Sequence, residues 1–238
     1  MGDVADEILR REATEDAERQ ARREEDEQQR RQRDMRSAWM AFSGPRYETC
    51  SFETFEIKND AQAEAVATCR RYVDELISGA TGGLILFGPT GTGKDHLAMA
   101  ICRSLMKTCW WPWGAASEFI SWNSRRFART TGPVMFSVVR DAMQHGQERE
   151  ILLSFTAPNL LALSDPTGPA GTRLTDFQVQ TLFAVADGRY AQRRPTILTV
   201  NVRDRASLEQ MLTNPISERF LDGATCVPCD WPSWRTTR

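Results

Sequence analysis

The most chemically distinctive segment of the chain is a glycine-rich run that follows a short apolar stretch. The apolar stretch spans residues 84–87, and the run that follows it is Gly88, Pro89, Thr90, Gly91, Thr92, Gly93 and Lys94. This is the spacing G-x-x-x-x-G-K between a strand-like and a helix-like segment. Glycines let the backbone curl so that successive N–H groups, with a helix N-terminus behind them, point at phosphate oxygens. The run therefore predicts a phosphate-binding loop in which Lys94 supplies positive charge for the terminal phosphates.

The residue after this lysine departs from the usual pattern. Asp95 stands where such loops carry a Ser or Thr whose hydroxyl ligates Mg²⁺. A second metal element is expected at the end of a buried strand, and the best candidate is the run from residue 159 to Ser164 and Asp165. In one interpretation Asp95 and Ser164 jointly hold Mg²⁺ while Asp165 polarises a water molecule. In others Asp165 itself holds the metal, or the hydrolytic site has decayed.

The elements around these residues alternate between helix-like and strand-like patterns from Arg46 onward. Apolar residues on one face predict a helix over residues 60–77. Short continuous apolar runs predict buried strands at 84–87, 160–163 and 196–200. Such an alternation is typical of the α/β class, with a mostly parallel sheet covered by helices.

The first 36 residues have a different composition. They hold 12 acidic residues and 9 arginines, so this segment cannot bury a core. Acidic and arginine residues recur three or four positions apart, as Glu15 with Arg19, which favours an exposed helix. Gly44-Pro45 should end that helix, and we divide the chain there into a charged arm (1–44) and a nucleotide-binding domain (45–238). The arm is either a solvated helix or a docking arm for a protein partner.

Overall composition limits the other functions. The chain has 238 residues, a formal net charge of −2 and a mean hydropathy of −0.46, with no run of about 18 apolar residues that could span a membrane. We expect a cytoplasmic protein without membrane contact, in which any DNA contact comes from a local patch. Such a patch is suggested by tryptophans followed closely by arginines. These residues are Trp110, Trp111, Trp113, Trp122, Arg125, Arg126 and Arg129. Packing in the core is favoured for most of the tryptophans, which leaves Arg125, Arg126 and Arg129 as the better candidates for DNA contact.

Taken in order along residues 45–224, the motifs resemble the AAA+ ATPase domain of the DnaC/IstB type, which includes helicase loaders and transposition helper ATPases. The matching segments are Pro45-Arg46-Tyr47 at the entry to the domain, Gly88 to His96 at the phosphate loop, Leu160 to Asp165 at the acidic strand, Pro195 to Asn201 at the sensor strand, and Ile216 to Phe220 around Arg219. Ser164 replaces the first of two adjacent acidic residues of the family.

The resemblance implies an AAA+ core without a separate lid domain that binds ATP and Mg²⁺ through its phosphate loop, including His96. Asn201 would sense the terminal phosphate, and Arg219 would be an arginine finger that completes the site of a neighbouring subunit in an ATP-dependent homo-oligomer. The implied partners are single-stranded DNA and a replicative helicase or transposase. Because of Asp95 and Ser164 we expect weak hydrolysis, and the alternative is a nucleotide-gated adaptor that binds ATP with little or no turnover. A small-molecule kinase is less favoured, since it gives Asn201 and Arg219 no role.

Overall fold

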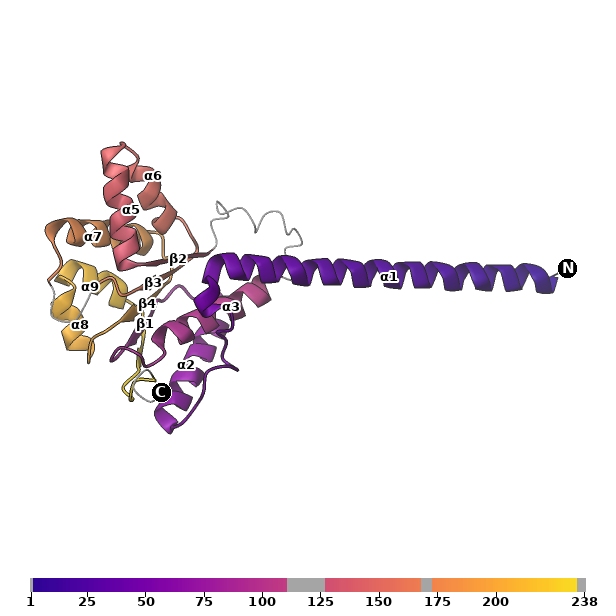
Figure 1. Ribbon diagram of the computed structural model, residues 1–238, viewed down its shortest axis with the longest axis horizontal. Helices are drawn as coiled ribbons and strands as arrows, with labels where there is room; N and C mark the ends of the chain where they lie inside the picture. The colour runs from indigo at the N-terminus through magenta and orange to yellow at the C-terminus, as the bar shows by residue number, and fades with distance from the viewer. Residues whose placement is uncertain (1, 111–126, 168–172, 235–238) are drawn as a thin grey trace.

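A five-stranded parallel sheet forms the centre of the protein (Figure 1). The computed structural model describes residues 2–110, 127–167 and 173–234. The strands are β1 (Leu84–Phe87), β2 (Phe127–Thr131), β3 (Leu160–Ser164), β4 (Thr196–Val200) and β5 (Thr225–Pro228). They lie in the order β2-β3-β4-β1-β5, and each neighbouring pair is parallel. The predicted α/β class is confirmed.

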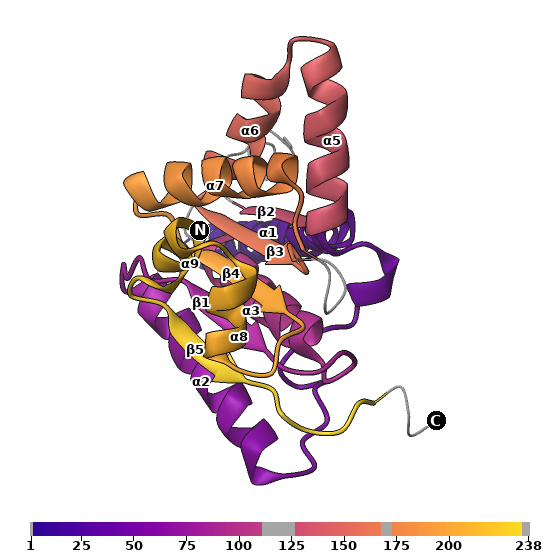
Figure 2. The same ribbon diagram turned by 90° about the vertical axis from the view of Figure 1, so that its left-hand side faces the viewer.

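Helices cover both faces of this sheet (Figure 2). On one side lie the end of α1 (Gly2–Ser43), α2 (Asp60–Ile77) and α3 (Lys94–Trp110). On the other lie α5 (Gly132–Gln144), α6 (Glu148–Thr156), α7 (Asp176–Ala191), α8 (Arg205–Met211) and α9 (Asn214–Leu221). Successive strand residues serve opposite cores because side chains alternate across a strand. Leu84 and Leu86 pack under α2 and α3, whereas Ile85 packs under the other layer.

Local capping explains where several helices begin. Asn59 accepts a hydrogen bond from the backbone of Gln62 and starts α2 at the predicted residue. Thr175 forms a capping box with Gln178 at the start of α7. Helix α9 begins at Asn214 with a proline in its first turn, and its cap position, Thr213, makes no side-chain bond.

One arginine is fully inside the fold. Arg189 on α7 is 1% exposed, and it donates to the carbonyls of Phe155, Pro158 and Pro195 and to the hydroxyl of Thr196. Burial lowers the pKa of this guanidinium to about 9. Its four bonds join α6, α7 and the starts of β3 and β4. Without Arg189, the three carbonyl oxygens would be buried with no donor.

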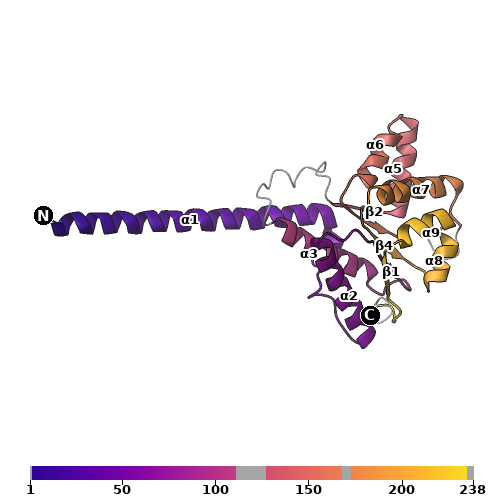
Figure 3. The same cartoon turned by 180° about the vertical axis from the view of Figure 1, so that it is seen from behind.

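The 42-residue helix α1 projects far from the rest of the molecule (Figures 1 and 3). The predicted pairing along it occurs between Arg19 and Glu15 at 3.5 Å and between Arg31 and Glu27. Only the base of the helix enters the core: Trp39 is 5% exposed, and its indole N–H donates to the carbonyl of Glu48 at 2.8 Å. Among the described residues, no helix has the length and apolar character needed to span a membrane.

Candidate nucleotide-binding site

The predicted phosphate loop connects β1 to α3, and its glycines are required by its shape. Gly88, Gly91 and Gly93 have φ of 149°, 87° and 91°, a region that side chains rarely adopt. A Cβ at Gly88 would lie 2.4 Å from the carbonyl oxygen of Cys229, and one at Gly93 would lie 2.8 Å from the ring of Phe55. Both substitutions would therefore distort the loop.

Lys94 begins α3 and is 5% exposed. Its Nζ donates to the carbonyl oxygens of Gly88 at 2.8 Å and Pro89 at 2.6 Å. These contacts hold the ammonium group against the loop, where a phosphate would meet it. The loop and the first turn of α3 thus supply a positive charge and helix-end N–H groups together.

Asp95 is surrounded by hydroxyl groups. Its Oδ1 accepts from Ser164 Oγ at 3.0 Å and Thr199 Oγ1 at 2.8 Å, and its Oδ2 accepts from the Tyr47 hydroxyl at 3.3 Å. Ser164 and Thr199 are register partners in β3 and β4, and both point to the face covered by α3. The sheet therefore brings together Asp95 and Ser164, as the exchanged-ligand interpretation requires.

Asp165 and Asn201 lie at the ends of the same two strands. Asp165 has φ of 48°, and its backbone N–H donates to the carbonyl of Thr199 at 2.9 Å. The side-chain amide of Asn201 donates to Asp165 Oδ1 at 2.6 Å. This fixes an acidic oxygen and an uncharged amide next to each other at the carboxyl edge of the sheet, beside the cluster around Asp95.

Most of these groups, although not Ser164, border one cavity of about 410 Å³. Its lining includes Arg46 and Tyr47, the loop residues Thr90, Gly91 and Gly93, Lys94, Asp95, His96, Asp165, Thr199, Asn201 and Trp234. Carboxylate and hydroxyl oxygens are the ligands that Mg²⁺ prefers. Among the described residues no three His, Cys, Asp or Glu side chains gather into a metal site, so phosphate oxygens would have to complete the coordination.

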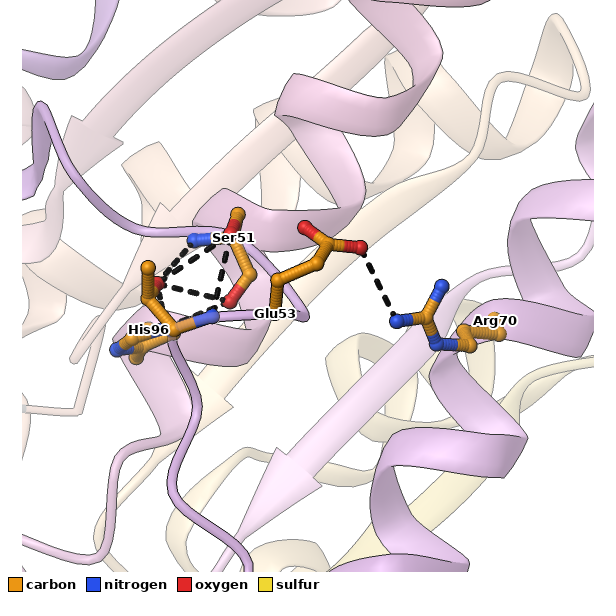
Figure 4. A network of polar contacts seen from close by, with 5 residues as sticks. Ser51, Glu53, Arg70 and His96 are labelled. Atoms are coloured by element: carbon orange, nitrogen blue, oxygen red, sulfur yellow. Dashed lines mark hydrogen bonds and ion pairs between the residues drawn. The ribbon is translucent and has the colours of Figure 1, made fainter.

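His96 contacts the entry segment of the domain as well as the cavity (Figure 4). Its Nε2 lies 2.8 Å from the carbonyl oxygen of Ser51 and 3.2 Å from the hydroxyl of Thr54. Burial lowers the pKa of the imidazole, which favours the neutral ring, and the ring packs edge-on against Phe55 with centroids 5.3 Å apart. His96 thus holds the segment before α2 against the phosphate loop.

The chain after β5 returns to the phosphate loop, which the sequence reasoning missed. The indole N–H groups of Trp231 and Trp234 both donate to the carbonyl of Thr92, at 2.8 and 3.3 Å. The backbone N–H of Trp234 donates to the carbonyl of Gly91 at 3.0 Å. Two tryptophans close together after the last strand can be seen in the sequence, but nothing in their spacing predicts a contact with the phosphate loop.

Arg219 lies apart from this cavity, on α9. Its Nε donates to Asp187 Oδ1 at 2.7 Å, and Nη1 donates to the carbonyl of Pro215 at 2.8 Å.

Arg129, which was expected to contact DNA, lies at the base of α1. It donates to the carbonyl of Ser43 at 3.2 Å, and its guanidinium stacks 4.5 Å from the centroid of the Tyr47 ring. The other residues expected to contact DNA lie outside the described residues. They are Trp111, Trp113, Trp122, Arg125 and Arg126, together with the side chain of Trp110.

Comparison with known proteins agrees with the motifs. The chain is 26% identical over 199 residues to the "Replicative helicase loader DnaC" of Escherichia coli (strain K12), covering 81% of this chain and 71% of that protein. The crystal structure of the DnaC helicase loader superposes with a TM-score of 0.65 at 22% identity, covering 78% of this chain and 99% of that one. The replication initiator DnaA bound to AMPPCP and single-stranded DNA has a TM-score of 0.58 at 18% identity, covering 80% and 52%.

No protein-family model matches the chain. The similarity to DnaC extends over four fifths of the sequence, and the fold agrees with it over nearly the same share. In sequence and in fold, this chain therefore resembles the DnaC/IstB-type AAA+ ATPases.

Proposed function

We propose that this protein binds ATP and acts on DNA as a helicase loader or transposition helper, with a replicative helicase or a transposase as its protein partner. The observation that carries the proposal is the convergence of Lys94, Asp95, Asp165 and Asn201 on one cavity at the end of a glycine-rich loop. The similarity to a protein named as a replicative helicase loader supports a helicase as the partner. Such a role also places the protein in the cytoplasm.

Different residues of the cavity would bind the phosphates and the Mg²⁺ of a bound triphosphate. N–H groups of the loop and the start of α3 would receive phosphate oxygens, and Lys94 would offset their charge. Asp95 with Ser164 would hold Mg²⁺, which leaves Asp165 to act on water. When bound, this cation would screen the repulsion between the carboxylate of Asp95 and the phosphates.

Hydrolysis would depend on Asp165 and Asn201 at the carboxyl edge of the sheet. Asp165 would accept a hydrogen bond from an attacking water, and Asn201 would orient the terminal phosphate or the carboxylate without adding charge. Their 2.6 Å hydrogen bond keeps the two groups together. Arg219 would supply further positive charge from a neighbouring copy, because it does not border the cavity of its own chain.

A second function, a nucleotide-gated adaptor with little or no turnover, is favoured by the hydroxyl at position 164. Ser164 stands where the resemblance expects the first of two adjacent acidic residues, and its hydroxyl donates to Asp95, so Asp165 is the acidic residue left at the strand end. Measuring ATP turnover with and without single-stranded DNA separates the two functions. Turnover that rises with DNA supports the ATPase, whereas tight ATP binding with no turnover supports the adaptor.

The proposal is tested most directly at Lys94. Lys94→Ala should weaken ATP binding by about 100-fold or more, since charge-assisted hydrogen bonds to phosphate are among the strongest in such a site. Lys107→Ala is the matched control, because Lys107 lies exposed near the other end of α3. Equilibrium titration with a fluorescent ATP analogue measures both. Wild-type affinity in Lys94→Ala would show that the loop does not bind nucleotide.

A further inference from the structure

The middle of α1 is built from residues that favour a helix in water. Residues 15–34, all of which the structure describes, consist only of alanine, glutamate, aspartate, arginine and glutamine. They include no glycine, no proline and no β-branched residue. All but aspartate are strong helix formers, because alanine and unbranched side chains lose little conformational freedom on a helix. The backbone of this segment therefore favours a helix without help from a core.

Ion pairs along the same stretch stabilise the helix further. Glu15 lies between two arginines, 3.4 Å from Arg11 and 3.5 Å from Arg19, each four positions away. Glu27 pairs with Arg31 at the same spacing. In the pairs of Arg19 and Arg31 the acidic residue comes first, which is the more favourable order on a helix. Each exposed pair contributes little alone, so the helix depends on the pairs and on residue propensity together.

The segment lacks the features by which a protein partner would be recognised. The side chains of residues 15–30 are all exposed, and alanine is the only apolar residue type from 15 to 34, so no apolar stripe runs along it. Interface centres are apolar and depleted of charged residues, whereas this segment mixes acidic residues with arginines. The large apolar residues before position 35 all precede the segment, as Met1, Val4, Ile8 and Leu9. A partner contact in the arm therefore belongs before residue 15.

The helix is fixed at its base. The indole N–H of Trp39 donates to the carbonyl of Glu48, and the guanidinium carbon of Arg103 on α3 lies 5.5 Å from the centroid of the same indole ring. Arg36 also pairs with Glu48, at 3.3 Å. Because these contacts come from the entry segment and from α3, the domain sets the direction in which α1 leaves it (Figures 1 and 3). A continuous helix carries that direction to its far end.

We propose that residues 15–34 form a self-supporting charged helix that acts as a rigid spacer, holding the first residues of the arm at a fixed distance and direction from the nucleotide cavity. As a helix these residues span about 30 Å in one direction. As a flexible chain their ends would lie about 25 Å apart on average, in no fixed direction. The spacer acts through its length and stiffness, so it goes beyond the proposed function and requires neither ATP nor a bound helicase.

The test measures distances within the full chain in the absence of ATP and helicase, so a failure of the proposed function does not affect it. Spin labels are attached through non-natural residues at the exposed positions 11 on α1 and 218 on α9. Pulsed EPR then gives the distribution of distances between them, which should be one narrow peak in the wild type. Deleting residues 15–32 removes five full helical turns, so the mean distance should fall by about 25 Å. A flexible arm predicts about half that fall.

A hinge variant tests stiffness at constant length. Gln28→Gly combined with Gln29→Gly places two residues of high backbone freedom in the segment, so the distance peak should broaden about twofold. Gln28→Ala with Gln29→Ala is the matched control, because it removes the same amides but keeps good helix formers, and its peak should equal that of the wild type. Both variants should keep the wild-type midpoint of thermal unfolding, since the two positions are exposed.

A pull-down with the purified helicase separates a spacer from a docking surface. The chain lacking residues 15–32 should still capture the helicase, because it keeps both the residues before 15 and the base of α1. Loss of capture would make the segment part of a docking surface and overturn the inference. A broad peak in the wild type would overturn it as well, and so would a double-glycine variant whose peak is as narrow as that of the double-alanine control.

Discussion

At the scale of single residues, the carboxylate of Asp95 is the feature that separates this site from the usual phosphate loop. Three hydroxyl donors, from Tyr47, Ser164 and Thr199, surround it. A triphosphate can approach that carboxylate only with a cation between them, because the two anions repel each other at short distance. The identity of residue 95 should therefore set how strongly ATP binding depends on Mg²⁺.

We expect the ATP affinity of the wild type to collapse when EDTA removes Mg²⁺, and the collapse to be smaller in Asp95→Thr. The threonine hydroxyl carries no charge, so the phosphates would meet less repulsion without the metal. Asp74→Thr, on the exposed side of α2, controls for the change in net charge. Calorimetric titrations in Mg²⁺ and in EDTA give the comparison. Equal wild-type affinity under both conditions would favour a decayed metal site over exchanged ligands.

A second residue-scale prediction concerns stability. Arg189→Met keeps much of the side-chain length but leaves the carbonyls of Phe155, Pro158 and Pro195 without their donor. Buried acceptors that lose a partner are costly, so the free energy of unfolding should fall by about 3 kcal/mol. Arg149→Met on the exposed face of α6 should change it by about 0.5 kcal/mol or less. Urea denaturation followed by circular dichroism measures both variants.

At the scale of elements, the segment after β5 supports the phosphate loop from outside. Trp231→Phe keeps a ring in the buried site but removes the N–H bond to Thr92. We expect about 1 kcal/mol less stability and about fivefold weaker ATP binding, because the loop loses one of its anchors. Trp39→Phe removes an equivalent indole bond at the base of α1. Trp39→Phe should lower the free energy of unfolding by a similar amount and leave ATP affinity unchanged. If both variants lose ATP affinity, the loss is due to general destabilisation.

The same scale shows what could be predicted from the sequence. The three central strands, β1, β3 and β4, were predicted because strands buried on both faces have continuous apolar sequences. The edge strands β2 and β5 were not, since an edge strand has fewer buried positions and tolerates polar residues such as Arg129 and Thr131. Helix α2 was found at its observed ends because its apolar residues recur on one face over the whole of its length.

The candidate site was predictable to the extent that its residues follow one another in sequence. The loop and Asp165 directly follow predicted strands, and Asp95 directly follows the loop. Thr199 was available from the alternation of side chains along β4, because it lies on the same face of the strand as Ile197. The contact of Tyr47 with Asp95 spans 48 residues and depends on how the entry segment crosses α3, which no local pattern records.

At the scale of the whole molecule, the arm and the nucleotide cavity meet at one junction. Arg129 donates to the carbonyl of Ser43, the last residue of α1, and stacks on Tyr47, whose hydroxyl donates to Asp95. The base of α1 is therefore three contacts away from the residue expected to face the metal. The rest of α1 leaves this junction as an exposed rod that no other described element covers (Figure 3).

This division predicts how truncation acts. Deleting residues 2–30 removes most of the charged rod but keeps Arg36, which pairs with Glu48, and the buried Trp39. The shortened chain should fold, bind ATP and self-associate like the wild type, because the described side chains of the removed segment, those of residue 11 and residues 14–30, are all exposed. It should lose capture of the partner helicase in a pull-down with purified proteins, since an exposed, uncovered helix of mixed charge is the surface left for such a contact.

Deleting residues 2–43 instead removes Trp39 and the carbonyl bound by Arg129. That variant should also lose stability, seen as a lower midpoint of thermal unfolding. If the 2–30 deletion still captures the helicase at wild-type affinity, the arm is a solvated helix, and the partner surface lies on the nucleotide-binding domain.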